Sequence, residues 1–204
     1  MGLSISVGIL GTPGLRDDAE VLHRALETAG VAWREPAAPD NGADGFYAGF
    51  PYSYLSKLRR VYVLHRVGEP VTGVRGVDEE QFEDEMELVD EETYLFDSHL
   101  LCHSDCEGYY IPTDFTDPLF LPTGSGVSGG GMVGSSGGLL AELQGFAAAI
   151  GVRLAADGTL DPAESARLAA LPADDPFEPE IFAWHQLYQA CRASLADGRA
   201  IVFG

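Results

Sequence analysis

Strand-like and helix-like segments alternate along this chain, and this alternation constrains the fold more than any other feature of the sequence. Residues 3–10 alternate apolar with small polar side chains, which is typical of a strand. Residues 178–196 place a broad apolar face at helical spacing, which predicts a long helix. Because such segments interleave from one end to the other, we expect an α/β or α+β fold in which helices flank a mixed sheet.

The middle of the sequence predicts a β-hairpin followed by a loop. Residues 93–103 and 109–115 have strand-like composition and are separated by a five-residue turn, so we expect a central β-hairpin at 93–115. Residues 122–138 are rich in glycine and serine, a composition that favours a flexible loop. A length of 204 residues suits one domain, so we expect residues 1–204 to form a single globular unit.

Acidic residues are concentrated in one part of the chain. The net charge is −20. No lysine or arginine occurs between Gly76 and Val152, whereas the same stretch contains 16 Asp and Glu residues. Eleven of these 16 lie between Asp78 and Asp97. This separation of charge predicts a surface that repels anions and attracts cations or basic partners.

The most acidic segment also has a helical pattern. Phe82, Met86 and Val89 stand at i, i+4 and i+7, so residues 78–90 predict a helix with one apolar stripe. Acidic side chains surround the stripe, and like charges at i, i+4 repel one another. A basic partner would relieve this repulsion, whereas the alternative is an acidic face that serves solubility alone. The predicted contacts with a basic partner are Glu79, Glu80, Glu83, Asp84, Glu87, Asp90, Glu91, Asp105 and Glu107.

The charge also limits the class of partner. Nucleic acids and anionic membranes both select lysine and arginine. A chain with 12 basic and 32 acidic residues has the opposite balance, so we predict a basic protein partner, no nucleic acid and no membrane. Three cysteines do not make a disulfide framework, and neither a signal peptide nor a bilayer-length apolar run is evident. We therefore expect a cytoplasmic protein, and we expect no cofactor.

An alternative function is a hydrolase or metal-dependent enzyme that uses the His/Cys/Asp cluster at 99–107. His99, Cys102 and Cys106 carry the imidazole and thiolate groups that zinc prefers, so they are candidate metal ligands. If this segment is a strand, His99 and His103 stand ~13 Å apart, too far to bind one ion. The spacing favours cysteines that pack as small apolar side chains.

Nucleophilic catalysis is a second version of this alternative. Cys106 would be the nucleophile and a histidine its base, but acidic neighbours oppose formation of the thiolate. Another arrangement joins Ser136, in a G-x-S-x-G pattern, to Asp175 and His185. The candidate catalytic residues of the cluster are His103, Asp105, Cys106 and His185.

Three segments carry a resemblance to a known class of proteins. They are SHLLCHSDCEGYYIPTDF at 98–115, GSSGGLLAELQGFA at 134–147, and the closing W-x-x-L-Y-x-A-C…AIVF pattern. In these segments the chain resembles small acidic bacterial proteins, some of which are similar to immunity proteins of polymorphic toxin systems. The resemblance implies a cytoplasmic single-domain protein that neutralises a basic toxin, and it assigns no catalytic residues to this sequence.

Overall fold

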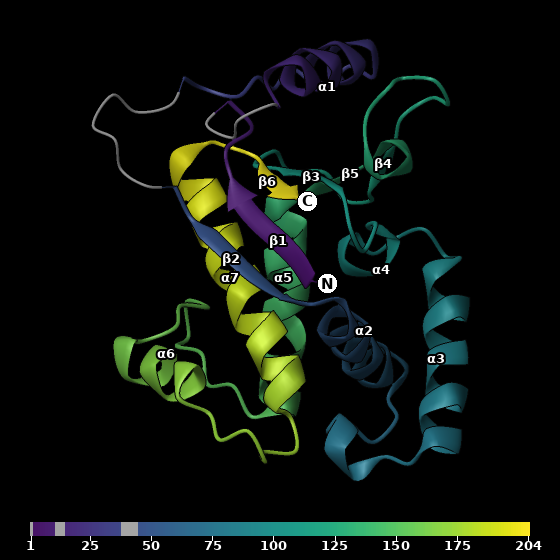
Figure 1. The fold of residues 1–204 in the computed structure, drawn as a ribbon, viewed down its shortest axis with the longest axis vertical. Coiled ribbons are helices and arrows are strands. Elements are labelled where there is room, and N and C mark those ends of the chain that lie inside the picture. Colours follow the sequence, from purple (N-terminus) through teal and green to yellow (C-terminus); the bar gives the residue numbers. More distant parts are fainter. Residues whose placement is uncertain (1, 11–14, 38–44) are drawn as a thin grey trace.

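The structure is a computed structural model, and it describes residues 2–10, 15–37 and 45–204. Within these residues, helices surround a six-stranded mixed sheet in a single domain, so the predicted fold class is confirmed as α+β (Figure 1). The helices in the described residues are α1 (Arg16–Thr28), α2 (Tyr52–Val67), α3 (Glu79–Thr93), α4 (His99–Cys102), α5 (Ser136–Phe146), α6 (Pro162–Ala169) and α7 (Glu178–Asp197). Short 3₁₀ turns are at Val74–Gly76, Gly129–Gly131 and Ala147–Ile150.

The sheet has the strand order β2-β1-β6-β3-β5-β4. Its strands are β1 (Gly2–Val7), β2 (Tyr47–Pro51), β3 (Gly108–Ile111), β4 (Leu119–Phe120), β5 (Met132–Ser135) and β6 (Ile201–Phe203). The pair β3–β5 is parallel, and the other neighbouring pairs are antiparallel. Strands from both ends of the chain meet at the centre, because β6 lies between β1 and β3.

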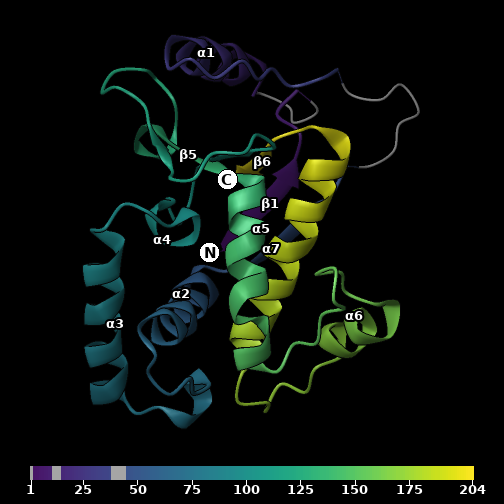
Figure 2. The same cartoon turned by 180° about the vertical axis from the view of Figure 1, so that it is seen from behind.

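Two apolar clusters fill the two faces of the sheet. On one face, α2, α5 and α7 pack against alternate side chains of β1 and β6, including Ile5 and Phe203. On the other face, α1 packs against the residues of opposite orientation, such as Tyr109 and Val202. In Figure 1, α5 and α7 lie behind β1. In Figure 2, which shows the opposite side, they lie in front of it, so both helices cover the same face of the sheet. The sheet and α2 thus form a framework on which the remaining helices are placed.

Local sequence explains where several helices begin and end. Asp161 caps α6, because its Oδ1 accepts a hydrogen bond of 2.8 Å from the backbone N–H of Glu164. Helix α2 ends at Gly68, and α7 ends at Gly198, where the backbone enters the left-handed region with φ of 82° and 69°. No helix in the described residues is both long enough and apolar enough to cross a bilayer.

Helix α3 lies at the edge of the molecule. It packs against α2 and α4 on one side, and its opposite side faces away from every other element in both views (Figures 1 and 2). The prediction of a helix at 78–90 is confirmed, and the expected stripe faces inward: Val89 is buried, and Phe82 and Met86 are half-buried.

The predicted hairpin at 93–115 is wrong. Its second strand exists as β3, but the first is replaced by the end of α3 and by α4. Two caps hold α4: Ser98 Oγ accepts from the backbone N–H of Leu101 at 3.1 Å, and the Glu142 carboxylate accepts from two further backbone N–H groups at 2.8 Å. Because Glu142 belongs to α5, a carboxylate far along the chain stabilises a helix where local composition favours a strand.

The predicted flexible loop at 122–138 is also wrong over its second half. Residues Met132–Ser135 form the buried strand β5, and α5 already begins at Ser136. A Cβ at Gly134 would overlap the Tyr110 ring, and a Cβ at Gly138 would overlap the His99 ring. Glycine at these two positions therefore permits close packing inside the fold.

Candidate functional site

The acidic residues on the inner side of α3 are neutralised by arginines of α2. The fully buried guanidinium of Arg60 donates from Nε to Glu85. Arg66 forms ion pairs with Glu92 at 2.8 Å and with Asp97, just beyond the helix, at 2.8 Å. Hydrogen bonding to Asp97 raises the pKa of Arg66 above its usual value. Arg60 and Arg66 of α2 therefore neutralise the inner side of α3.

The outer side of α3 carries exposed carboxylates only. We call this set the acidic face; it consists of Glu79, Glu80, Glu83, Asp84, Glu87, Asp90 and Glu91. At 3.6 residues per turn, all seven fall within an arc of roughly 140°. In the part of the chain that the structure describes, none of them forms an ion pair. The sequence predicted these seven as contacts, and the structure brings them together on one exposed surface.

The charge on the acidic face is closely spaced along the helix axis. From Glu79 to Glu91 the axis rises ~18 Å at ~1.5 Å per residue. Seven carboxylates over this length give about 3 Å per charge, close to the 3.4 Å per charge along one strand of B-DNA. Asp78 starts the helix, since its Oδ1 accepts from the backbone N–H of Gln81 at 2.9 Å. The exposed face of α3 thus presents a band of negative charge whose density along the helix axis is close to that of one DNA strand.

The two predicted contacts outside α3 have different surroundings. Asp105, between α4 and β3, forms an ion pair with Arg59 of α2, so its charge is largely compensated. Glu107 is exposed and lines a hollow of about 240 Å³ together with Asp18 and Ser6. None of the residues that line this hollow belongs to α3. The structure therefore does not place Asp105 and Glu107 with the acidic face.

The alternative metal ligands are not brought together. His99 is buried, and its Nδ1 accepts from the backbone N–H of Ser135 at 3.1 Å. Burial lowers the pKa of His99 and raises the pKa of Cys102. The Cys102 thiol faces the backbone oxygen of Thr93 at 3.8 Å, whereas Cys106 is exposed. Within residues 2–10, 15–37 and 45–204, no group of three or more His, Cys, Asp or Glu residues could hold a metal ion.

The alternative catalytic residues are also separated. His103 is buried and stacks on Tyr110 with ring centroids 4.1 Å apart, and burial lowers the pKa of His103 to about 4. The Cys106 Sγ contacts Ser104 Oγ at 3.7 Å instead of an imidazole. His185 lies on α7, where its Nε2 is 3.0 Å from Ser165 Oγ. No contact among the described residues joins a thiol to a histidine base.

The serine arrangement fails for a similar reason. Ser136 is fully buried in α5, and its Oγ is 2.7 Å from the Oγ of Ser194 in α7. This hydroxyl therefore joins two core helices, and it makes no hydrogen bond to His185 or Asp175. The G-x-S-x-G pattern here reflects the glycine-rich packing of β5 and α5.

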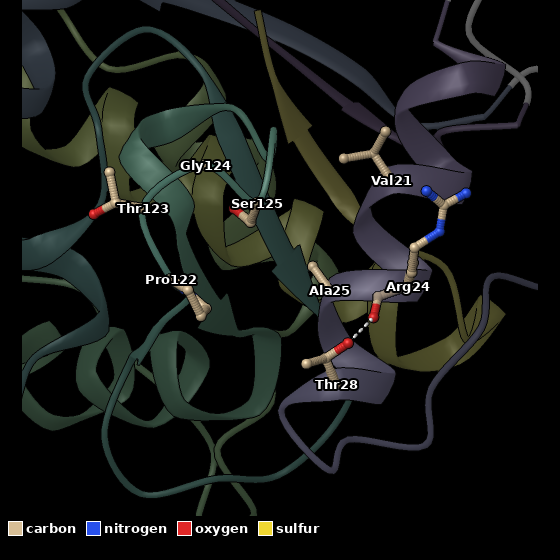
Figure 3. A pocket seen from close by; sticks show the side chains of 8 residues that line it. All are labelled: Val21, Arg24, Ala25, Thr28, Pro122, Thr123, Gly124 and Ser125. Carbon is tan, nitrogen blue, oxygen red and sulfur yellow. Dashed lines mark hydrogen bonds between the residues drawn. The ribbon is translucent and has the colours of Figure 1, made fainter.

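A separate hollow of about 310 Å³ lies between α1 and the loop at 122–125 (Figure 3). Val21 and Ala25 point from α1 toward the loop, while the Arg24 guanidinium points to the other side of the helix in this view. Thr28 Oγ1 donates to the backbone oxygen of Arg24 at 2.8 Å. The hollow has no buried charged group with which to hold a ligand.

Comparison with known proteins adds one finding to this geometry. No curated protein and no solved structure matches the chain. A protein-family model does match, over residues 1–203, and its description is "Putative DNA-mimic protein".

This match corrects the predicted partners. The sequence predicted a basic protein partner, for which the resemblance implied a toxin, and no nucleic acid, whereas the family description refers to mimicry of DNA. Negative charge opposes contact with DNA phosphates, and it is also the property that imitation of DNA requires. The resemblance to immunity proteins is not tested by the match and stays a prediction. Since the family model covers nearly the whole chain, this acidic α+β protein belongs to the family described as "Putative DNA-mimic protein".

Proposed function

We propose that this protein binds a DNA-binding protein at its DNA site and thereby competes with DNA. The observation that carries the proposal is the acidic face of α3. Its seven exposed carboxylates pair with no cation in the described part of the chain, and they stand at about 3 Å per charge along the axis. A surface that binds the phosphates of DNA presents lysine and arginine at a matching spacing. The acidic face offers such a surface the same sign and nearly the same density of charge.

The distribution of arginines supports this proposal over a role in solubility alone. Solubility requires net charge, but it does not require the charges to be sorted by side. Among the described residues, Arg60 and Arg66 neutralise inner carboxylates of α3, and no cation pairs with the outer ones. The arrangement concentrates the negative potential on the side of α3 that a partner can reach.

Competition with DNA also follows from the physics of the charge. A DNA-binding surface attracts an acidic protein over roughly a Debye length, so encounter is fast at low salt and slower as salt rises. The partner cannot use the same cations for both ligands, and binding of the mimic and of DNA is therefore mutually exclusive.

The proposal is tested by displacement. The immobilised protein is incubated with extract of its host at 50 mM NaCl, and bound proteins are eluted with a short duplex DNA. We expect the eluted proteins to be DNA-binding proteins. Each is then purified and bound to a labelled duplex, and we expect the wild-type protein to release the duplex in a concentration-dependent manner.

A matched variant makes the displacement specific. Replacing Glu83 and Glu87 with glutamine removes two central charges of the acidic face, and we expect displacement to require a higher concentration of protein. Replacing two exposed acidic residues elsewhere, Glu69→Gln and Asp174→Asn, gives the same net charge and leaves displacement near wild type. A ternary complex of partner, duplex and this protein would contradict the proposal.

A further inference from the structure

Exposed aromatic side chains gather where α3 ends. We call Tyr94, Leu95, Phe96 and Phe120 the aromatic cluster; these side chains are 74%, 57%, 51% and 52% exposed. The first three follow α3 directly, and Phe120 comes from β4, 24 residues beyond Phe96. The Phe96 ring packs edge-to-face against Tyr94 at 6.3 Å and against Phe120 at 5.4 Å. Two distant segments thus build one exposed apolar patch.

The backbone at the centre of the cluster is strained. Phe96 has φ of 59°, and in the part of the chain that the structure describes it is the only residue other than glycine with positive φ. This conformation is common for glycine or asparagine after a helix and is unfavourable for a bulky side chain. The Phe96 ring contacts two other exposed rings and is itself 51% exposed. Strain of this kind, held at an exposed position, is characteristic of functional sites.

The cluster adjoins the acidic face. Asp90 and Glu91 stand four and three positions before Tyr94, so on the helical surface they are its neighbours. Both carboxylates are exposed, and neither pairs with a cation among the described residues. Aromatic rings beside uncompensated carboxylates form a surface that is complementary to arginine, whose guanidinium stacks on a ring while it donates hydrogen bonds to a carboxylate.

We propose that the aromatic cluster anchors the partner by stacking against arginine side chains of its DNA-binding surface. This inference rests on the proposed function and names the chemistry that the partner must contribute. In an edge-to-face pair only one face of one ring is covered, and Tyr94, Phe96 and Phe120 are each more than half exposed, so a guanidinium can reach the cluster. Stacking depends less on ionic strength than phosphate-like contacts do. It therefore retains a partner at salt concentrations that weaken the attraction of the acidic face.

The test compares two labelled probes, a ten-residue arginine peptide and a ten-residue lysine peptide of equal charge. Fluorescence anisotropy gives the Kd of each for the full chain at 50, 150 and 500 mM NaCl. We expect the wild-type protein to bind the arginine peptide more tightly. In Tyr94→Ser we expect the ratio of the two affinities to fall by about two- to fivefold, the loss of one exposed cation–π contact. Tyr47→Ser is the matched control, because Tyr47 is also 74% exposed but lies on β2, and its ratio stays at the wild-type value.

A second variant separates binding from folding. Phe96→Gly removes a ring of the cluster and relieves the backbone, so we expect its urea midpoint to equal or exceed that of the wild type while the preference for arginine falls. An unchanged preference in both Tyr94→Ser and Phe96→Gly overturns the inference, and so does a large loss of stability in Phe96→Gly, which would make the ring structural.

Failure of the inference is distinguishable from failure of the proposed function. Replacing Glu83 and Glu87 with glutamine weakens both peptides if the acidic face binds cations. If that variant binds both peptides as the wild type does, the proposed function fails. If it binds both more weakly while the aromatic variants keep the preference for arginine, only the aromatic anchor is overturned.

Discussion

Replacing Glu83 and Glu87 with glutamine is expected to make the protein more stable and at the same time a weaker binder. On α3, Glu83 and Glu87 take part in six like-charge pairs at i, i+3 or i, i+4, including the pair that they form with each other. Such a pair destabilises a helix by ~0.2–0.5 kcal/mol, so removal of six pairs raises the free energy of unfolding by ~1–3 kcal/mol. Glutamine and glutamate have similar helix propensity, so the change in charge dominates.

Salt provides an internal check on this reasoning. The Cβ atoms of such pairs are ~5–6 Å apart, which is less than the Debye length of ~10 Å at 0.1 M and more than that of ~3 Å at 1 M. We therefore expect the gain in stability to be largest at 20 mM NaCl and nearly absent at 1 M. Urea denaturation followed by far-UV circular dichroism measures the free energy of unfolding at both salt concentrations. The control pair Glu69→Gln and Asp174→Asn changes the net charge equally, yet neither residue lies on α3.

The binding half of the prediction uses the same variant. On DNA, each phosphate contact contributes ~0.9 to the slope of log K against log salt. We therefore expect the loss of two phosphate-like contacts to lower the magnitude of this slope by up to ~2. Titration of the arginine peptide at several NaCl concentrations gives this slope. Unchanged stability at 20 mM, or a gain that persists at 1 M, would refute the view that these carboxylates repel one another on a shared face.

Three further predictions concern the framework that holds α3. The buried Glu180 carboxylate lies 3.6 Å from the Arg60 guanidinium, and Arg60→Met leaves it without this cation. We expect the free energy of unfolding, measured by urea denaturation, to fall by ~3–5 kcal/mol. An unchanged urea midpoint would exclude a stabilising role for this ion pair. Burial raises the pKa of Glu142 from 4.5 to about 7, so the folded state holds this proton more tightly than the unfolded state does, and stability falls as pH rises between these values. Glu142→Gln should flatten that pH profile, and an identical profile in the variant would rule Glu142 out as its source. Gly134→Ala places a Cβ against the Tyr110 ring, and we expect the free energy of unfolding to fall by ~1–3 kcal/mol, measured by thermal unfolding. A melting temperature equal to that of the wild type would contradict the close packing.

Local patterns were sufficient for the parts of the fold that depend on near neighbours. The periodicity of 178–196 predicted α7 almost to its ends. The apolar stripe of α3 predicted which side faces the core, and so placed seven acidic residues on the exposed side. In each case the determining residues lie within a few turns of one another, where sequence spacing translates directly into geometry.

The features that the sequence did not predict depend on contacts between distant segments. Helix α4 forms because Glu142, more than 40 residues away, accepts hydrogen bonds from its first N–H groups. The aromatic cluster requires Phe120 to meet Phe96, and the close packing of Gly134 requires Tyr110. The sequence also could not distinguish between classes of partner, because an excess of carboxylates is equally suited to a basic toxin and to the DNA-binding protein that we propose.

The ion pairs that join α2 to α3 have a thermodynamic consequence. A disordered acidic tail would lose conformational entropy when a partner fixed its carboxylates in place, and that loss would subtract from its affinity. Here the ion pairs of Arg60 and Arg66 hold α3 against the rest of the fold in the free protein, before a partner binds. The geometry of the charges is thus preorganised by folding, much as base pairing holds the phosphates of a duplex in register.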